Sequence, residues 1–244
     1  MGCFSLSQEQ IEQYDDLGYL VIDVAAPEWQ IDQIASWTKE EFADCRMGRR
    51  QDAWKYNSQV RDLTFDQHVT QALSDLYPGR KCVPFQTLNF CVGTQQALHS
   101  DTIHFNSYPA SGMCGVWVAM EDVHPDAGPL MIVPGSHKWP EETMQSAGVT
   151  PSELNYRYYE YHIAGLVERS GVKAEPALIK KGQALIWASN LIHGGSAIRD
   201  PKTTRISQVT HYFMLGADFY YTPMLSDLTT GQITKRDLAS IAVR

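Results

Sequence analysis

The sequence has little of what marks several large classes of protein. It carries 20 basic against 28 acidic residues and no long basic run, so nucleic acid is not an expected partner. No apolar run approaches the roughly 18 residues of a membrane span, and we expect no membrane association. The five cysteines form no C-x-x-C pair. They predict reduced, mostly buried thiols in a cytoplasmic protein.

The N-terminus also lacks a recognisable targeting signal. No basic segment followed by an apolar block is present, so a signal peptide is not expected. Gly2 and Cys3 fit part of an acylation pattern, but Leu6 stands where the myristoylation motif needs Ser or Thr. We therefore expect no lipid anchor.

What remains is the composition of a globular protein with a substantial core. The chain has 244 residues, of which 43% are hydrophobic and 20% charged. No internal repeat or low-complexity linker divides it. We predict a single domain, with a mainly helical part over 1–80, a β-barrel core over 82–216 and a C-terminal segment over 217–244. The oligomeric state cannot be read from the sequence.

The predicted helices lie at the start of the chain. Ser7 and Gln10 have the spacing of a capping box, and Gly18 suits the end of that helix. The apolar run "YLVI" follows as a strand. Apolar periodicity predicts two further helices, at about 28–44 and 65–77.

Short β-rich runs dominate after residue 82. Among them are "VPFQTLNFCV", "CGVWVAM", "PLMIV", "PALI", "QALIWA" and "ISQVTHYFML", separated by turn signals such as "DAGP", "KKG" and "RDPK". Many short strands with this punctuation predict a mainly β fold with flanking helices and a jelly-roll, cupin-like core.

The stretch 139–176 fits neither helices nor barrel strands well and is predicted to be an insertion. Its part at 152–166 is rich in tyrosine, which argues against disorder. One hypothesis is a lid over the site, with Tyr158 and Tyr161 contacting substrate. The alternative is a helix packed on the outside of the barrel, or an oligomer contact.

The segment "QALHSDTIHF" predicts a metal site. His99 and Asp101 are two residues apart, so on a strand they point to the same face. His193 follows the apolar run "ALIWA" and could supply a third ligand. Two histidines and one carboxylate form the facial triad that suits non-haem Fe(II) and leaves three positions open. H-x-D alone is weak, because most such pairs are structural.

Arg205 strengthens that interpretation. It follows His193 across the "IRDPKTT" turn, on the return strand. An arginine binds carboxylates through a planar, bidentate fork. Arg205 could therefore meet the distal carboxylate of 2-oxoglutarate while the other end of that molecule chelates iron.

Taken together, these segments resemble the phytanoyl-CoA dioxygenase family. The resemblance is carried by H-S-D at 99–101, "DAGPLMIVPGSHK" at 126–138, "HGGS…R" over 193–205 and the opening "LSQEQIEQYDDLGYLVI". This family is a branch of the Fe(II)/2-oxoglutarate oxygenases with a double-stranded β-helix. The resemblance implies His99, Asp101 and His193 as iron ligands and Arg205 as the anchor of 2-oxoglutarate. It also implies O2 as cosubstrate, with succinate and CO2 as co-products.

Four further residues are candidate cosubstrate contacts. Trp117 matches the family's tryptophan near the cosubstrate, although plain core packing is an alternative. Ser196 could add a hydroxyl, but it lies one residue later than the family's usual serine. Gln86 and Asn89 precede the metal motif. Because they are three apart on a strand, at most one should point inward.

A polar substrate pocket is predicted around the metal. Its candidate residues are His104, Asn106, Tyr108, His211 and Trp54. A structural role is the alternative for His104 and His211. His137, in the "PGSHK" turn, is not expected to be a ligand, because the triad is complete without it.

The expected function is an Fe(II)- and 2-oxoglutarate-dependent dioxygenase that hydroxylates, or oxidatively demethylates, a small and polar metabolite. Related halogenases carry a small residue where this chain has Asp101, so the resemblance favours hydroxylation. Acyl-CoA is disfavoured by the lack of a basic patch for its phosphates. Two alternatives stay open: a metal enzyme that does not use 2-oxoglutarate, and a non-catalytic barrel that binds a small molecule. A nucleic-acid demethylase is disfavoured by the charge.

Overall fold

The computed structural model describes residues 4–42, 48–110 and 112–237. Its helices are α1 (Gln8–Leu17), α2 (Glu28–Glu41), α3 (Ser58–Thr64), α4 (Gln67–Leu76) and α5 (Tyr156–Ser170). Its strands are β1 (Tyr19–Asp23), β2 (Arg50–Gln51), β3 (Cys82–Phe90), β4 (Asn106–Tyr108), β5 (Met113–Ala119), β6 (Leu130–Ile132), β7 (Glu175–Pro176), β8 (Gln183–Ala188), β9 (His193–Gly195), β10 (Ser207–Met214), β11 (Phe219–Tyr221) and β12 (Lys235–Arg236). Short 3₁₀ helices are η1 (Ala53–Lys55), η2 (Asp101–Ile103), η3 (Ser136–Lys138), η4 (Glu153–Asn155) and η5 (Pro223–Leu225).

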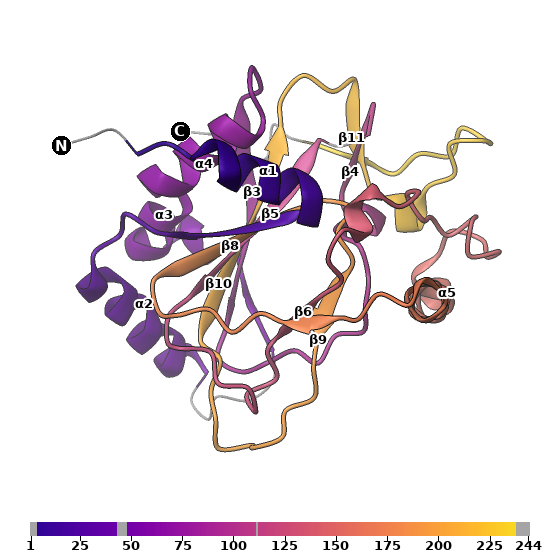
Figure 1. Ribbon diagram of the computed structural model, residues 1–244. Coiled ribbons are helices and arrows are strands. Elements are labelled where there is room, and N and C mark those ends of the chain that lie inside the picture. Colours follow the sequence, from indigo (N-terminus) through magenta and orange to yellow (C-terminus); the bar gives the residue numbers. More distant parts are fainter. Residues whose placement is uncertain (1–3, 43–47, 111, 238–244) are drawn as a thin grey trace.

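The strands form three antiparallel sheets. The largest has the order β1-β8-β5-β10-β3-β2, and the smaller two have the orders β7-β6-β9 and β12-β11-β4. In Figure 1 the large sheet and the β6–β9 pair lie on opposite sides of the interior. This arrangement confirms the predicted mainly β fold with a jelly-roll core.

The N-terminal part contributes to the barrel as well as covering it. Ser7 and Gln10 form the expected capping box, and Gly18 ends α1 in the left-handed conformation with φ of 81°. Strand β1 then pairs with β8 at the edge of the large sheet, and β2 pairs with β3. The boundary near residue 80 therefore separates segments of sequence that share one sheet.

Helices α2, α3 and α4 lie over the outer face of the large sheet, on the left of Figure 1, and α1 lies across the top of the view. Ile34 of α2 and Leu73 of α4 share a buried cluster with Val116 of β5 and Ile186 of β8. Helices α2 and α4 occupy the predicted ranges, whereas α3 was not expected. Its residues between the two predicted helices carry too short an apolar pattern to stand out.

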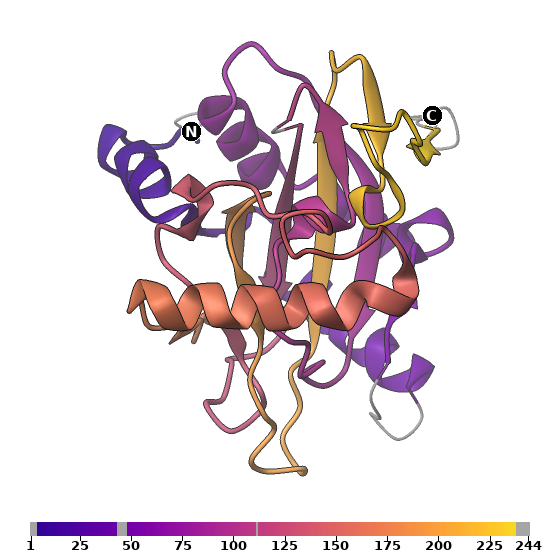
Figure 2. The same ribbon diagram turned by 90° about the vertical axis from the view of Figure 1, so that its right-hand side faces the viewer.

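Helix α5 lies on the opposite side of the molecule and crosses the view of Figure 2. Its Tyr159 and Ile163 pack with Ile103 and Ile192, beside the small β7-β6-β9 sheet. The predicted insertion therefore contains a helix with a fully buried face. This packing agrees with the alternative of a helix on the outside of the barrel.

The cysteine expectation needs a correction. Cys91 is disulfide-bonded, so the prediction of reduced thiols throughout is wrong at that position. Cys82 and Cys114 are free, while Cys3 and Cys45 lie outside the described residues, as does Gly2. The sequence could not show the bond, because bonding depends on which thiols the fold brings together. No helix within the described residues is long and apolar enough to cross a membrane.

Candidate metal centre

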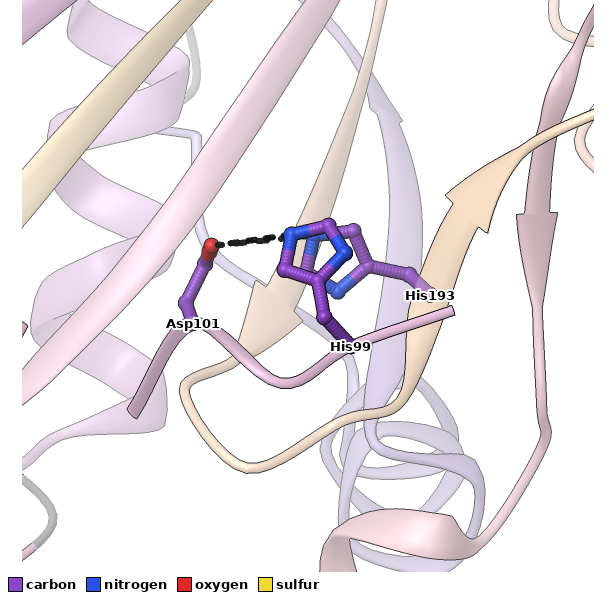
Figure 3. Close-up of side chains that lie close together, drawn as sticks. All are labelled: His99, Asp101 and His193. Carbon is purple, nitrogen blue, oxygen red and sulfur yellow. Dashed lines mark ion pairs between the residues drawn. The ribbon is translucent and has the colours of Figure 1, made fainter. Parts of the chain in front are cut away.

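Three buried side chains converge between the sheets: His99, Asp101 and His193. Each is 4–5% exposed, and their potential ligand atoms all lie within 4.8 Å of one another. Asp101 Oδ1 lies 3.8 Å from the Nε2 atoms of both histidines. Figure 3 shows the carboxylate facing the two imidazoles.

Backbone pairing brings the two histidines together across a long stretch of sequence. The amide of His99 donates to the carbonyl of His193, and the amide of His193 donates to the carbonyl of His99, both at 2.9 Å. Gly194 and Gly195 permit this approach. A Cβ at either position would lie about 2.9 Å from backbone atoms of residues 95–97. The glycines in "HGG" thus have a packing role beside the ligand.

Asp101 does not share a regular strand with His99, in contrast to the sequence-based expectation. After the backbone pairing of His99 with His193, the chain leaves the extended conformation beyond Ser100 and begins η2 at Asp101. Ser100 caps this turn by accepting from the amide of Thr102. The two ligands still point to one place, but a 3₁₀ turn aims the carboxylate rather than strand alternation.

Both histidines present the same nitrogen to the site. Their Nδ1 atoms lie 2.9 Å from the carbonyl oxygens of Ala97 and Leu191. Since a carbonyl only accepts, each Nδ1 carries the proton and each Nε2 keeps its lone pair for a metal. Burial lowers the pKa of His99 to about 3, so this imidazole is neutral near pH 7.

The carboxylate of Asp101 is held on its other side. Its Oδ2 accepts from Trp187 Nε1 at 2.8 Å and lies 3.5 Å from His211 Nε2. Burial alone would raise the pKa of Asp101, but His193, His211 and His99 outweigh burial and lower it well below its usual range. Gly115 makes room for this support, because a Cβ there would collide with the Trp187 ring.

These features fit an Fe(II) ion. The donor set is two neutral imidazole nitrogens and one ionised carboxylate oxygen, the facial triad of non-haem iron oxygenases. The non-ligating atoms of all three residues have partners of the kind that orient metal ligands. His137 takes no part. Its Nε2 lies 3.1 Å from the carbonyl of Asp15, outside the cavity.

Arg205 lies in the same cavity and is also buried, with 3% of its surface exposed. Its Nη1 donates to the carbonyl of Gly128 at 2.9 Å, and its guanidinium lies 5.4 Å from the ring centroid of Trp117. Burial lowers the pKa of Arg205 to about 10, so it stays cationic near pH 7. Within the described residues no acid is paired with it, and its Nε has no partner. An unpaired buried cation is a site for an anionic ligand.

The cavity measures about 210 Å³ and brings together several of the predicted residues. Besides the triad and Arg205, it is lined by Gln86, Trp117, His104 and His211. Gln86 points inward and Asn89 points away, where it donates to Gln208 Oε1 at 3.4 Å. This is the alternation that the spacing of the two residues predicted.

Other predicted residues do not line this cavity. Ser196 donates to the carbonyl of Pro129 at 3.2 Å, and Asn106 donates to Glu141. Tyr108 stacks on Phe219 and is half exposed. Trp54 is buried beside a second hollow, beyond Gln86.

The two predicted lid contacts also lie away from the cavity. Tyr158 and Tyr161 are 42% and 70% exposed on α5 and are absent from the cavity lining. Tyr156, the first residue of α5, contacts a lining residue instead, because its hydroxyl lies 3.1 Å from His104 Nε2.

Four residues of the site were not anticipated: Trp187, Gln96, Tyr156 and Arg49. Trp187 lies inside "QALIWA", where alternation could have placed it on the inner face. Gln96 lines the cavity, and its amide nitrogen lies 3.2 Å from His99 Nε2. No local pattern pointed to Tyr156 or Arg49. Tyr156 contacts His104 from α5, and Arg49 lines the cavity from just before β2.

Comparison with known protein families agrees with this geometry. A model of the family described as phytanoyl-CoA dioxygenase (PhyH) matches residues 14–207. That span is well over half of the chain and contains the triad and Arg205. The chain belongs to the phytanoyl-CoA dioxygenase family. As a member of this family of Fe(II)/2-oxoglutarate oxygenases, it has iron, 2-oxoglutarate and O2 as its cofactors and cosubstrates.

Solved structures of similar fold include the non-heme alpha ketoglutarate dependent carbocyclase SnoK from nogalamycin biosynthesis. It is 17% identical with a TM-score of 0.69, and the match covers 97% of this chain and 96% of SnoK. The epimerase SnoN, solved with Fe3+, alpha ketoglutarate and nogalamycin RO, is 16% identical with a TM-score of 0.65, covering 94% and 95% of the two chains.

EctD from S. alaskensis, solved with 2-oxoglutarate and 5-hydroxyectoine, is 19% identical with a TM-score of 0.64. The match covers 85% of this chain and 76% of EctD. At these sequence identities, the similarity to the solved structures confirms the jelly-roll fold of this chain. No curated protein sequence matches the chain.

Proposed function

We propose that this protein is a dioxygenase that hydroxylates, or oxidatively demethylates, a small and polar metabolite with formation of succinate and CO2. One observation carries the proposal. A single cavity holds a buried triad of two neutral imidazoles and a carboxylate, and also a buried, unpaired guanidinium. Binding of 2-oxoglutarate needs both features. One end of the molecule chelates the metal, and the carboxylate at the other end pairs with the cation.

The proposed roles follow from the contacts. His99, Asp101 and His193 hold iron, which when bound supplies the O2 chemistry that couples decarboxylation of 2-oxoglutarate to oxidation of the substrate. Arg205 takes the distal carboxylate of 2-oxoglutarate, above the ring of Trp117. Trp187 and His211 keep the carboxylate of Asp101 oriented. The protein orients the reactants in a cavity lined by residues of the large sheet and of strands β6 and β9.

Asp101 supports hydroxylation over halogenation. All three ligand positions of the triad are filled by side chains, so no protein ligand site is left vacant for a halide. Gln86, Gln96 and His104 give the lining neutral polar groups, which supports a polar substrate.

We further propose that the chain works as one domain, with the small-molecule substrate as its partner. Its cytoplasmic location stays a prediction. The disulfide at Cys91 argues against it, because disulfides are rare in cytosolic proteins.

The test is a turnover assay. The protein is first reconstituted with Fe(II) in the absence of O2. We expect succinate to form only when both 2-oxoglutarate and O2 are then supplied. A screen of polar metabolites should yield one product that is heavier by a single oxygen for hydroxylation, or lighter by one CH2 group with release of formaldehyde for demethylation. Oxidation of a metabolite without 2-oxoglutarate would support the alternative of a different metal enzyme. Tight binding of a metabolite by protein that binds neither Fe(II) nor 2-oxoglutarate would support a non-catalytic binding barrel.

A further inference from the structure

One charged residue of the cavity has no role in the reaction described above. Of the charged Arg, Lys, Asp and Glu side chains lining it in the described residues, Asp101 belongs to the metal and Arg205 to the cosubstrate. Arg49 remains. Within the described part of the chain, the side chain of Arg49 forms neither an ion pair nor a hydrogen bond. A guanidinium left unpaired at a substrate cavity is available to an anion.

The pairing of β2 with β3 explains why Arg49 faces inward. Arg50 pairs with Asn89 and Gln51 pairs with Leu88. One step back, Arg49 therefore comes opposite Phe90, and cross-strand neighbours share a face of the sheet. Phe90 and Leu88 line the cavity, whereas the side chain of Asn89 points away from it.

Its neighbour Arg50 provides an internal comparison. Arg50 Nε lies 2.7 Å from Glu41 Oε2, and the guanidinium lies 5.3 Å from the ring centroid of Phe42. The outward arginine is thus neutralised by the protein itself, and the inward one is not.

Two guanidinium groups, those of Arg49 and Arg236, act on the side of the cavity near His104. Burial is the main cause that lowers the pKa of His104 to about 4. Asp101 opposes this shift, whereas His211, Arg236 and Arg49 act in the same direction as burial. Arg236 lies 4.5 Å from the ring centroid of Phe105, which lines the cavity. Asp101 is the one acid in the lining among the described residues. In a protein with a net charge of −8, the lining thus holds two guanidinium groups, those of Arg49 and Arg205, against one carboxylate.

We propose that the substrate is a small oxyanion, a carboxylate or a phosphate monoester, whose charged group pairs with Arg49 while its oxidised carbon faces the metal. This inference rests on the function proposed above, because it assigns Asp101 to iron and Arg205 to 2-oxoglutarate. Arg49 then acts as a residue of substrate specificity, and neutral analogues of the substrate bind weakly.

The experiment measures binding to protein loaded with Mn(II) and 2-oxoglutarate, so that no turnover occurs. The probes are a panel of small metabolite carboxylates and phosphate monoesters, each matched with its neutral amide or alcohol. We expect at least one acid to bind far more tightly than its neutral partner. Which series contains it identifies the anion. In Arg49→Gln its affinity should fall about 10- to 100-fold, as for loss of a hydrogen bond to a charged group, and Arg49→Lys should retain part of it.

Two controls make the outcome specific. Arg50→Gln removes a neighbouring charge that faces away from the cavity, and it should leave acid binding unchanged. The affinity for 2-oxoglutarate should be unchanged in Arg49→Gln. The inference is overturned if no acid binds, if neutral partners bind as well as acids, or if both arginine variants behave alike. It is also overturned if Arg49→Gln weakens 2-oxoglutarate instead. Failure of the parent protein to bind 2-oxoglutarate would be a separate result, against the proposed function.

Discussion

The two ends of the cavity are buried to the same degree but are built in opposite ways. At the metal end, the atoms of the triad that do not face one another are held by Ala97, Leu191 and Trp187. At the other end, Arg205 has a single carbonyl partner and no acid in the described residues. One end therefore presents lone pairs that need a cation, and the other presents a cation that needs an anion.

This difference shows what the cavity is prepared to receive. A buried guanidinium without a counter-charge is unfavourable, because its desolvation is not offset by an ion pair. The three ligands at the metal end are likewise crowded, with Oδ1 and two Nε2 lone pairs directed into one space. A metal and a dicarboxylate together satisfy both ends. Binding of the two therefore offsets the energetic cost of holding these groups in place, and it should stabilise the fold.

Changes at the metal end should have the largest effect. His99→Ala, Asp101→Ala and His193→Ala each leave two ligands. Iron affinity should then fall by more than the roughly 10- to 100-fold typical of changes to partners of ligands. Iron content after reconstitution and the rate of succinate formation are the measurements. His104→Ala is the matched control for iron content alone, because His104 lines the same cavity outside the triad. Normal iron content and turnover in any triad variant would remove that residue from the metal site.

Changes at the cationic end should come next. Removing the charged partner of a buried carboxylate costs about 2–5 kcal/mol, or roughly 30- to several-thousand-fold in affinity. Arg205→Ala should therefore raise the apparent KM for 2-oxoglutarate far more than it changes iron affinity. Arg205→Lys should restore only part of the loss, since lysine lacks the planar fork.

Arg199 offers the control for that experiment. It lies six residues before Arg205 in the sequence, but its side chain is 77% exposed and lies 3.8 Å from Asp126. It does not line the cavity. Arg199→Ala should leave the KM for 2-oxoglutarate unchanged. If Arg205→Ala instead binds 2-oxoglutarate as tightly as the parent, the two-ended description of the cavity is wrong.

The sequence predicted the parts of both ends that carry their own chemistry. His99, Asp101, His193 and Arg205 are recognisable because few other residue types can perform those roles, and the structure places them in one cavity. The strands were visible from their apolar runs and turns. Helix α1 was visible from its caps, which involve residues close in sequence.

What the sequence could not predict depends on contacts between distant segments. Ser196 follows the ligand histidine closely, yet its hydroxyl is used by Pro129. Tyr158 and Tyr161 were chosen for their residue type, but the buried face of α5 is the one that carries Tyr159. Helix periodicity alone does not say which face packs inward when aromatic residues occupy both. Arg49 reaches the cavity through strand register, which no local pattern specifies.

Support for the metal ligands should matter less than the ligands themselves. Trp187→Phe removes the donor at 2.8 Å from Asp101 Oδ2 and leaves an aromatic ring in place. Iron affinity should fall about 10- to 100-fold, with 2-oxoglutarate affinity affected only through the metal. Trp117→Phe is the control at the other end of the cavity. Equal iron affinities in the two variants would mean that the indole bond does not orient Asp101.

The smallest effect is expected where α5 contacts His104. Tyr156→Phe removes the hydroxyl that lies 3.1 Å from His104 Nε2, and a neutral hydrogen bond contributes about 0.5–1.5 kcal/mol to the free energy of unfolding. Tyr158→Phe, on the exposed face of the same helix, should change that free energy by less than about 0.5 kcal/mol. Chemical denaturation of the two variants gives the comparison, and neither should alter iron affinity.

Limited proteolysis then tests whether α5 moves. Because Tyr159, Ile163 and Val167 are buried, cleavage within 152–166 should be slow with or without 2-oxoglutarate. Rapid cleavage that 2-oxoglutarate and substrate suppress would show instead that this helix is a lid.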